Sequence, residues 1–174
     1  MDASALRDEA TRLYKTGQLD QAITAFEQVH AEYAAQGNEA QTASVANDLG
    51  VVYFVTGKPQ QARDALNEAL AAFEKLGDVA GQAKAIGNLA QLLRRSGDKA
   101  GAEKNYTRAA DLFHQAGESG MEQDTFRALS QMQLQRGRWL EALAAYDRAL
   151  AAKGGSRLLR AFLQIPLKIV GLRR

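Results

Sequence analysis

The sequence predicts an all-α fold, an α-solenoid of four tandem antiparallel helix pairs followed by a C-terminal amphipathic helix. The main observation is a repeat of 40 residues, marked by Gly17, Gly57, Gly97 and Gly137. Five residues after each glycine, the same register places Ala22, Ala62, Ala102 and Ala142. The composition agrees, because two prolines and 46% hydrophobic residues, many of them alanine, favour helices over a sheet.

Each predicted helix has apolar residues at helical spacing and ends near a glycine. Leu6, Ala10 and Leu13, for example, recur at helical intervals before Gly17. A glycine at this place closes a helix, because it adopts a left-handed backbone without a Cβ clash. In chain order, the helices are expected over residues 3–16, 19–36, 39–56, 59–76, 79–96, 98–116, 120–136 and 139–152.

The helix starts carry signals of their own. Asn38 followed by Gln41, and Ser119 followed by Glu122, match the capping-box pattern. Pro59 falls in a first helical turn, where its missing N–H costs no hydrogen bond. Starts and stops together divide the chain into units at residues 1–37, 38–77, 78–117 and 118–153, before a final segment at 154–174.

A single helix pair has too little apolar surface to be stable alone, so neighbouring pairs are expected to stack. The repeated alanines allow two helix axes to approach closely, and a larger residue four positions later fills the space beside them. These larger core residues are Phe26, Leu66, Tyr106 and Tyr146. In the last pair, the expected core also includes Phe126, Leu129, Met132, Leu134, Trp139, Leu143 and Leu150.

The first helices of the second and third units have a second pattern, Leu-Gly or Leu-Ala followed by an aromatic residue or leucine, as in Leu49, Gly50 and Tyr53. With the glycine and alanine ladder, it resembles the tetratricopeptide repeat, in a long 40-residue form similar to kinesin light chain repeats. The resemblance implies a right-handed superhelix. It also implies a concave groove, lined by the first helices, that binds a peptide or helix of a partner protein. Glu9 and Gln133 depart from the pattern in the terminal units.

The family register implies a groove that mixes apolar side chains with cations. Its residues here are Arg7, Thr11, Tyr14, Asn47, Val51, Phe54, Lys84, Gln91, Arg94, Arg127, Gln131 and Leu134. Such a lining suits a partner segment with apolar anchors and acidic residues, although an ordinary solvated surface explains the cations equally well. Family members that grip chaperone C-termini need asparagine where this chain has Thr11 and Asp48, so that kind of binding is not expected.

The sequence predicts neither a catalytic site nor a cofactor, and the expected function is a non-catalytic scaffold or adaptor. The chain has no cysteine, and no His, Asp or Glu cluster has the spacing of a metal site. The glycines are periodic helix stops and do not form a phosphate-binding loop. His30 and His114 occupy different repeat positions, where surface residues are the expected interpretation, and they alone keep an enzyme among the alternatives.

The segment 156–174 differs from the repeats, because it has five basic residues and no acidic residue. The remaining 155 residues have 22 − 5 = 17 basic and 20 acidic residues, a balance of −3. After a hinge at Gly154 and Gly155, the segment is expected to form a helix with opposite apolar and basic sides. The expected interface consists of the apolar Leu158, Leu159, Phe162, Leu163, Ile165 and Ile169 and the basic Arg157, Arg160 and Lys168.

Three interpretations of this segment stay open: a cap on the last pair, an anchor on an anionic membrane, or a docking element for a partner or another copy. As an anchor, it makes the chain a peripheral membrane module that recruits partner proteins. The N-terminus lacks a signal-peptide pattern, so a cytoplasmic location is expected, at the inner face of a membrane in the anchor interpretation. A monomer and a homodimer both fit. Nucleic acid is not an expected partner, because interleaved stacking aromatics are missing.

Overall fold

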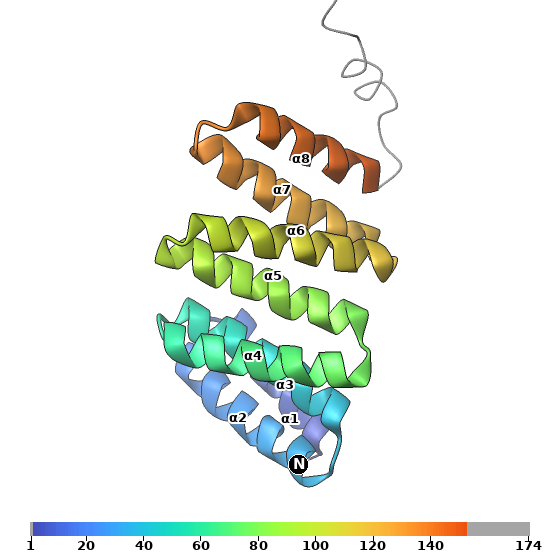
Figure 1. The fold of residues 1–174 in the computed structure, drawn as a ribbon. Coiled ribbons are helices and arrows are strands. Elements are labelled where there is room, and N and C mark those ends of the chain that lie inside the picture. The colour runs from blue at the N-terminus through green and yellow to red at the C-terminus, as the bar shows by residue number, and fades with distance from the viewer. Residues whose placement is uncertain (1, 153–174) are drawn as a thin grey trace, which may run out of the picture.

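A computed structural model describes residues 2–152 of the chain, which fold into eight α-helices without a strand (Figure 1). The helices are α1 (Ala3–Lys15), α2 (Leu19–Ala35), α3 (Glu39–Val55), α4 (Pro59–Leu76), α5 (Val79–Ser96), α6 (Lys99–Gln115), α7 (Ser119–Gln135) and α8 (Trp139–Ala152). Each predicted helix is present, with ends that differ from the expected ones by at most one residue. The all-α solenoid is confirmed, whereas the predicted hinge and C-terminal helix lie outside the described residues.

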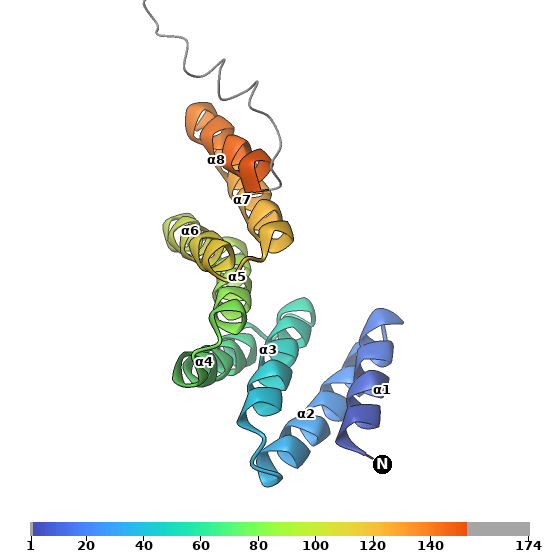
Figure 2. The ribbon, with the colours of Figure 1, turned by 90° about the vertical axis from the view of Figure 1, so that its right-hand side faces the viewer.

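The helices pack in chain order, so that each antiparallel pair is stacked on the next (Figures 1 and 2). Figure 2 shows α3, α5 and α7, the first helices of their pairs, on the side of the array opposite to α4 and α6. We call the surface formed by α1, α3, α5 and α7 the first-helix face. Among the described helices, none is long and apolar enough to span a lipid bilayer.

The turns between helices use glycine in a left-handed conformation, as the repeat predicts. Gly37, for example, has a φ of 68° and donates its N–H to Ala34 O at 3.0 Å. The next N–H, of Asn38, reaches back to Tyr33 O at 2.9 Å. These two bonds satisfy carbonyls that the end of α2 would otherwise leave without a partner.

The predicted capping boxes are only partly formed. Asn38 caps α3 as expected, since its Oδ1 accepts a hydrogen bond from Gln41 N at 3.2 Å. The prediction of a capping box at Ser119 and Glu122 is wrong. Helix α7 begins at Ser119, one residue before the predicted start, and its N-cap residue Glu118 makes no side-chain hydrogen bond to the helix. The Glu122 carboxylate instead lies 3.2 Å from His114 Nδ1, so a contact between helices replaces the local one.

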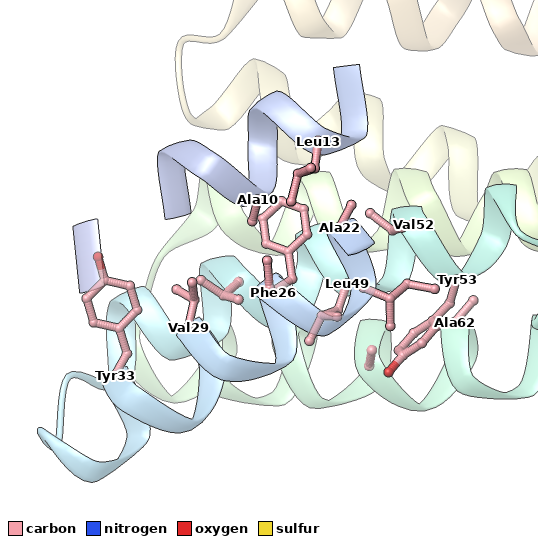
Figure 3. Packing of buried hydrophobic residues seen from close by; sticks show 14 of the residues in the cluster. Ala10, Leu13, Ala22, Phe26, Val29, Tyr33, Leu49, Val52, Tyr53 and Ala62 are labelled. Atoms are coloured by element: carbon pink, nitrogen blue, oxygen red, sulfur yellow. The ribbon is translucent and has the colours of Figure 1, made fainter. Parts of the chain in front are cut away.

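Small residues bring the helices together, and aromatic residues fill the space between them (Figure 3). Ala22, Ala62 and Ala102 are completely buried. Gly50 has the same role in α3, because a Cβ added there would lie 2.5 Å from Leu66 Cγ of α4. In Figure 3, the ring of Phe26 points from α2 toward α1. The periodic small residues thus set the close spacing that a helix-repeat core needs.

The last pair departs from the expected core. Leu134, Trp139, Leu143 and Tyr146 are all exposed in the described structure, although Ala142 and Ala149 beside them are buried. The periodicity correctly predicts that α8 has an apolar side. It does not tell whether another element covers that side, and no described helix follows α8.

We expect the stability of the fold to fall at high pH through Tyr53, whose hydroxyl donates to Glu27 Oε1. Burial, together with this carboxylate, raises the pKa of Tyr53 to about 12, above the value of about 10 for an unfolded tyrosine. The stabilisation is therefore complete below about pH 10 and is lost as the pH rises toward about 12. Urea unfolding over this range should show a steeper decline for the wild type than for Tyr53→Phe. Parallel declines would mean that Tyr53 keeps an ordinary pKa.

Candidate partner-binding groove

The first-helix face contains a cavity of about 330 Å³ between α5 and α7. Gly87, in the middle of α5, is one of its lining residues. A Cβ built at Gly87 would meet only Ala109 Cβ, at 3.9 Å, so the position is open and not packed. The cavity is lined by Asn47, Lys84, Gly87, Asn88, Gln91, Tyr106, Phe113, Met121, Asp124, Thr125 and Ala128.

The inner wall of this cavity is aromatic and comes from the second helix of the pair. Tyr106 and Phe113 of α6 are buried, and both belong to the core as well as to the cavity. Burial raises the pKa of the Tyr106 hydroxyl, while the neighbouring Arg94 guanidinium acts in the opposite direction. Because Tyr106 is only 3% and Phe113 only 2% exposed, the two rings form the floor of the cavity and present little surface to a bound molecule.

The rim of the cavity is polar and carries charges of both signs. Asn88 Nδ2 donates to Asn47 Oδ1 at 2.9 Å, which joins α5 to α3 and orients both amides. Lys84 and Asp124 are exposed at the rim, on α5 and α7 respectively. Amides and charges around an apolar depression supply the orienting contacts that are typical of a ligand site.

A second cavity, of about 280 Å³, lies between α1 and α3 and includes the predicted groove residues Arg7, Thr11, Tyr14 and Val51. The Arg7 guanidinium donates to Gln41 Oε1 and Ser44 Oγ, each at 2.7 Å, and pairs with Asp48 Oδ2 at 2.8 Å. Three acceptors on α3 thus hold this cation in place. The finding also explains why Gln41 does not complete its capping box.

Phe54 lines a third cavity, of about 250 Å³, between α3 and α5. The guanidinium of Arg95 lies 5.1 Å from the centre of its ring, at the distance of a cation–π contact, and donates to Phe54 O at 3.2 Å. The sequence prediction missed Arg95, because the register of a helix does not show toward which neighbour a long side chain turns.

The structure brings only some of the predicted groove residues together. Asn47, Lys84 and Gln91 share the cavity between α5 and α7, which we call the Gly87 cavity. Four other predicted groove residues are exposed but line none of these three cavities, namely Arg94, Arg127, Gln131 and Leu134. Outside the described residues lie all the predicted tail-interface residues, namely Leu158, Leu159, Phe162, Leu163, Ile165, Ile169, Arg157, Arg160 and Lys168.

The opposite side of the array has a wider depression of about 710 Å³ along α6. Glu103 accepts hydrogen bonds there from Gln133 Nε2 at 3.0 Å, Arg136 Nη1 at 2.9 Å and Arg138 Nη1 at 2.7 Å. These bonds join the turn between α7 and α8 to α6. They also give a structural reason for the polar Gln133 at a position where other units have Tyr53 or Leu93.

Both histidines contact a carboxylate of another helix. His30 Nε2 lies 2.8 Å from Glu68 Oε1, between α2 and α4, and His114 Nδ1 lies 3.2 Å from Glu122 Oε2, between α6 and α7. Neither histidine has a hydrogen bond to a serine, threonine or lysine among the described residues, although Ser119 lines the same depression as His114 and Glu122. These pairs connect neighbouring helix pairs.

The stacked antiparallel helix pairs, with cavities along the first-helix face, define a helical-repeat protein of the solenoid class. Two sequence models described as "Tetratricopeptide repeat" match the chain, one over residues 2–75 and 41–115 and the other over residues 88–157. The chain therefore belongs to the tetratricopeptide repeat family, as the resemblance in the sequence predicted. Curated protein sequences gave no match.

Solved structures of low sequence identity share this fold. The chain is similar to BtubC (BKLC) from P. vanneervenii, with a TM-score of 0.76 and 23% identity over 87% of this chain and 63% of that chain. It is also similar to a putative kinesin light chain with nearly identical TPR-like repeats from Podosopora anserina, with a TM-score of 0.71, 18% identity, and 87% and 74% coverage. For MamA, the TM-score is 0.59, with 21% identity and 83% and 74% coverage. The chain spans less than two thirds of the BtubC chain, and these identities show the fold alone.

Proposed function

We propose that the chain is a non-catalytic adaptor whose first-helix face holds a segment of a partner protein, with the Gly87 cavity as the main contact. Tetratricopeptide repeats are protein-interaction scaffolds, and the proposal adds the place and the chemistry. The observation that carries it is a cavity with an amide rim and an aromatic floor, lined by Gly87 at a position where a Cβ would have only an ordinary contact.

The lining indicates which segment would fit. Met121 and Ala128, above the floor of Tyr106 and Phe113, would contact one apolar side chain. The amides of Asn47, Asn88 and Gln91 would bond to its backbone. Lys84 and the exposed Arg94 favour an acidic residue beside this anchor. The partner segment therefore combines an apolar anchor with at least one carboxylate.

Charge reversal at the rim tests this proposal. Random linear peptides displayed on phage should be selected on the full-length protein, and the enriched sequences should pair an apolar residue with acidic residues. We expect Lys84→Glu to weaken binding of these peptides by about tenfold, since a lost charge pair of about 1.4 kcal/mol corresponds to that factor.

Lys104→Glu is the matched control, because Lys104 is also an exposed lysine and lines the depression along α6 on the opposite side of the array. It should leave the affinity of the peptides within about twofold of the wild type. No enrichment of peptides, or a larger loss with Lys104→Glu than with Lys84→Glu, would reject the first-helix face as the binding site.

A further inference from the structure

The last helix of the array exposes an apolar stripe. Trp139, Leu143 and Tyr146 follow one another at helical spacing on one side of α8, and we call them the α8 stripe. Trp139 is 64% exposed, and Leu140 next to it is also exposed. In the first, second and third units, the positions that correspond to Leu143 have Ile23, Arg63 and Glu103. The second and third units are therefore polar at a place where the last unit is apolar.

The repeat shows what normally covers this side. Tyr146 corresponds to Phe26, Leu66 and Tyr106, which are only 3%, 1% and 3% exposed, whereas Tyr146 is 43% exposed. Tyr106 is covered partly by Phe126 and Leu129, which belong to the first helix of the following pair and lie in the same cluster. In Figures 1 and 2, the described helices all lie on one side of α8, where α7 is its neighbour. Tyr146 thus occupies a position that the following helix pair covers at Phe26 and Tyr106. Trp139 and Leu143 extend this apolar surface to positions where the second unit has the exposed Pro59 and Arg63, so their apolar character belongs to the last unit.

We propose that residues 156–172 of the same chain cover the α8 stripe and act as a built-in cap on the array. These residues follow α8 directly after Gly154 and Gly155, so the chain can reverse its direction at that point. Leu158, Phe162 and Ile165 recur at the spacing of one helical side. The inference is independent of the proposed peptide binding, since no residue of α8 lines the Gly87 cavity and no partner is needed.

Length and charge both fit this occupant. Seven residues separate Trp139 from Tyr146, which is about 10 Å along a helix, and residues 156–164 alone form about 13 Å. The segment 156–174 has five positive charges, whereas residues 1–155 have a net charge of −3. The short link also favours the chain's own segment, because its effective concentration near α8 is of millimolar order and a second copy has to compete with it.

The fluorescence of Trp139 tests the proposal directly, because Trp139 is the sole tryptophan of the chain. In the full-length protein, we expect blue-shifted emission and weak quenching by acrylamide. The double variant Leu158→Asp/Phe162→Asp should shift the emission to longer wavelength, with a several-fold increase in quenching. Ser156→Asp/Gln164→Asp adds the same charge on the polar side of the segment and should behave as the wild type.

Each other outcome would overturn the proposal in a distinct way. An exposed Trp139 in the wild type, unchanged in the double variant, would show that nothing covers the stripe. Shielding that disappears on dilution, together with a dimer mass by light scattering, would assign the stripe to a second copy. Shielding that requires vesicles containing phosphatidylserine would assign the segment to a membrane. Peptide binding in the groove is measured separately, so a failure here leaves that proposal unaffected.

Discussion

Replacement of Tyr106 by alanine is expected to lower the free energy of unfolding by about 3–5 kcal/mol, the usual cost of removing a buried aromatic side chain. Tyr106 is almost completely buried and lies in one cluster with Ala90 of α5 and with Phe126 and Leu129 of α7. Its loss would therefore open a cavity at the junction of two neighbouring pairs. Urea unfolding followed by circular dichroism measures the effect.

The conservative variant Tyr106→Phe is the control, because it keeps the ring and removes only the hydroxyl. It should cost less than about 1.5 kcal/mol, as a single lost hydrogen bond does. If Tyr106→Ala costs no more than an exposed substitution, within about 0.5 kcal/mol of the wild type, the pairs are not joined through this residue.

The second large effect is expected on binding, from Gly87→Leu. A leucine side chain would fill the Gly87 cavity and exclude the apolar anchor of the partner, and anchors of this kind contribute about 2–4 kcal/mol. We therefore expect the affinity for the selected peptides to fall about 100-fold. Stability should stay unchanged or rise by up to about 1 kcal/mol, because leucine favours a helix more than glycine does.

Gly87→Ala provides the graded control for this prediction. An alanine Cβ at position 87 has only an ordinary contact with Ala109 and leaves most of the cavity open. Its effect on affinity should be small, and its stability should match that of Gly87→Leu. Equal peptide affinity for Gly87→Leu and the wild type, measured by calorimetry, would exclude the cavity as the anchor site.

The repeat made most of the fold predictable from the sequence. Gly37 and Ala102 have the backbone and the burial that their register predicts, because each unit repeats the same local solution. The failures concern contacts between distant residues. Trp139 and Leu134 are exposed, because periodicity identifies an apolar side but not the element that covers it. The Ser119 capping box is absent, because Glu122 is engaged by His114.

The candidate site was predicted less completely. Asn47, Lys84 and Gln91 are indeed neighbours, since all three follow from the register of the first helices. Tyr106 and Phe113 were missed as lining residues, because they belong to a second helix and the register assigns them to the core. A register also cannot show that Arg7 is held by three acceptors on α3.

The most direct test of the adaptor function is a titration of the ¹⁵N-labelled full-length protein with a selected peptide, followed by amide NMR. The binding site proposed here predicts the largest chemical-shift changes at Asn47, Gly87, Gln91 and Thr125, around the Gly87 cavity. Changes confined to the opposite side of α6, at Lys104 and Arg108, would contradict it.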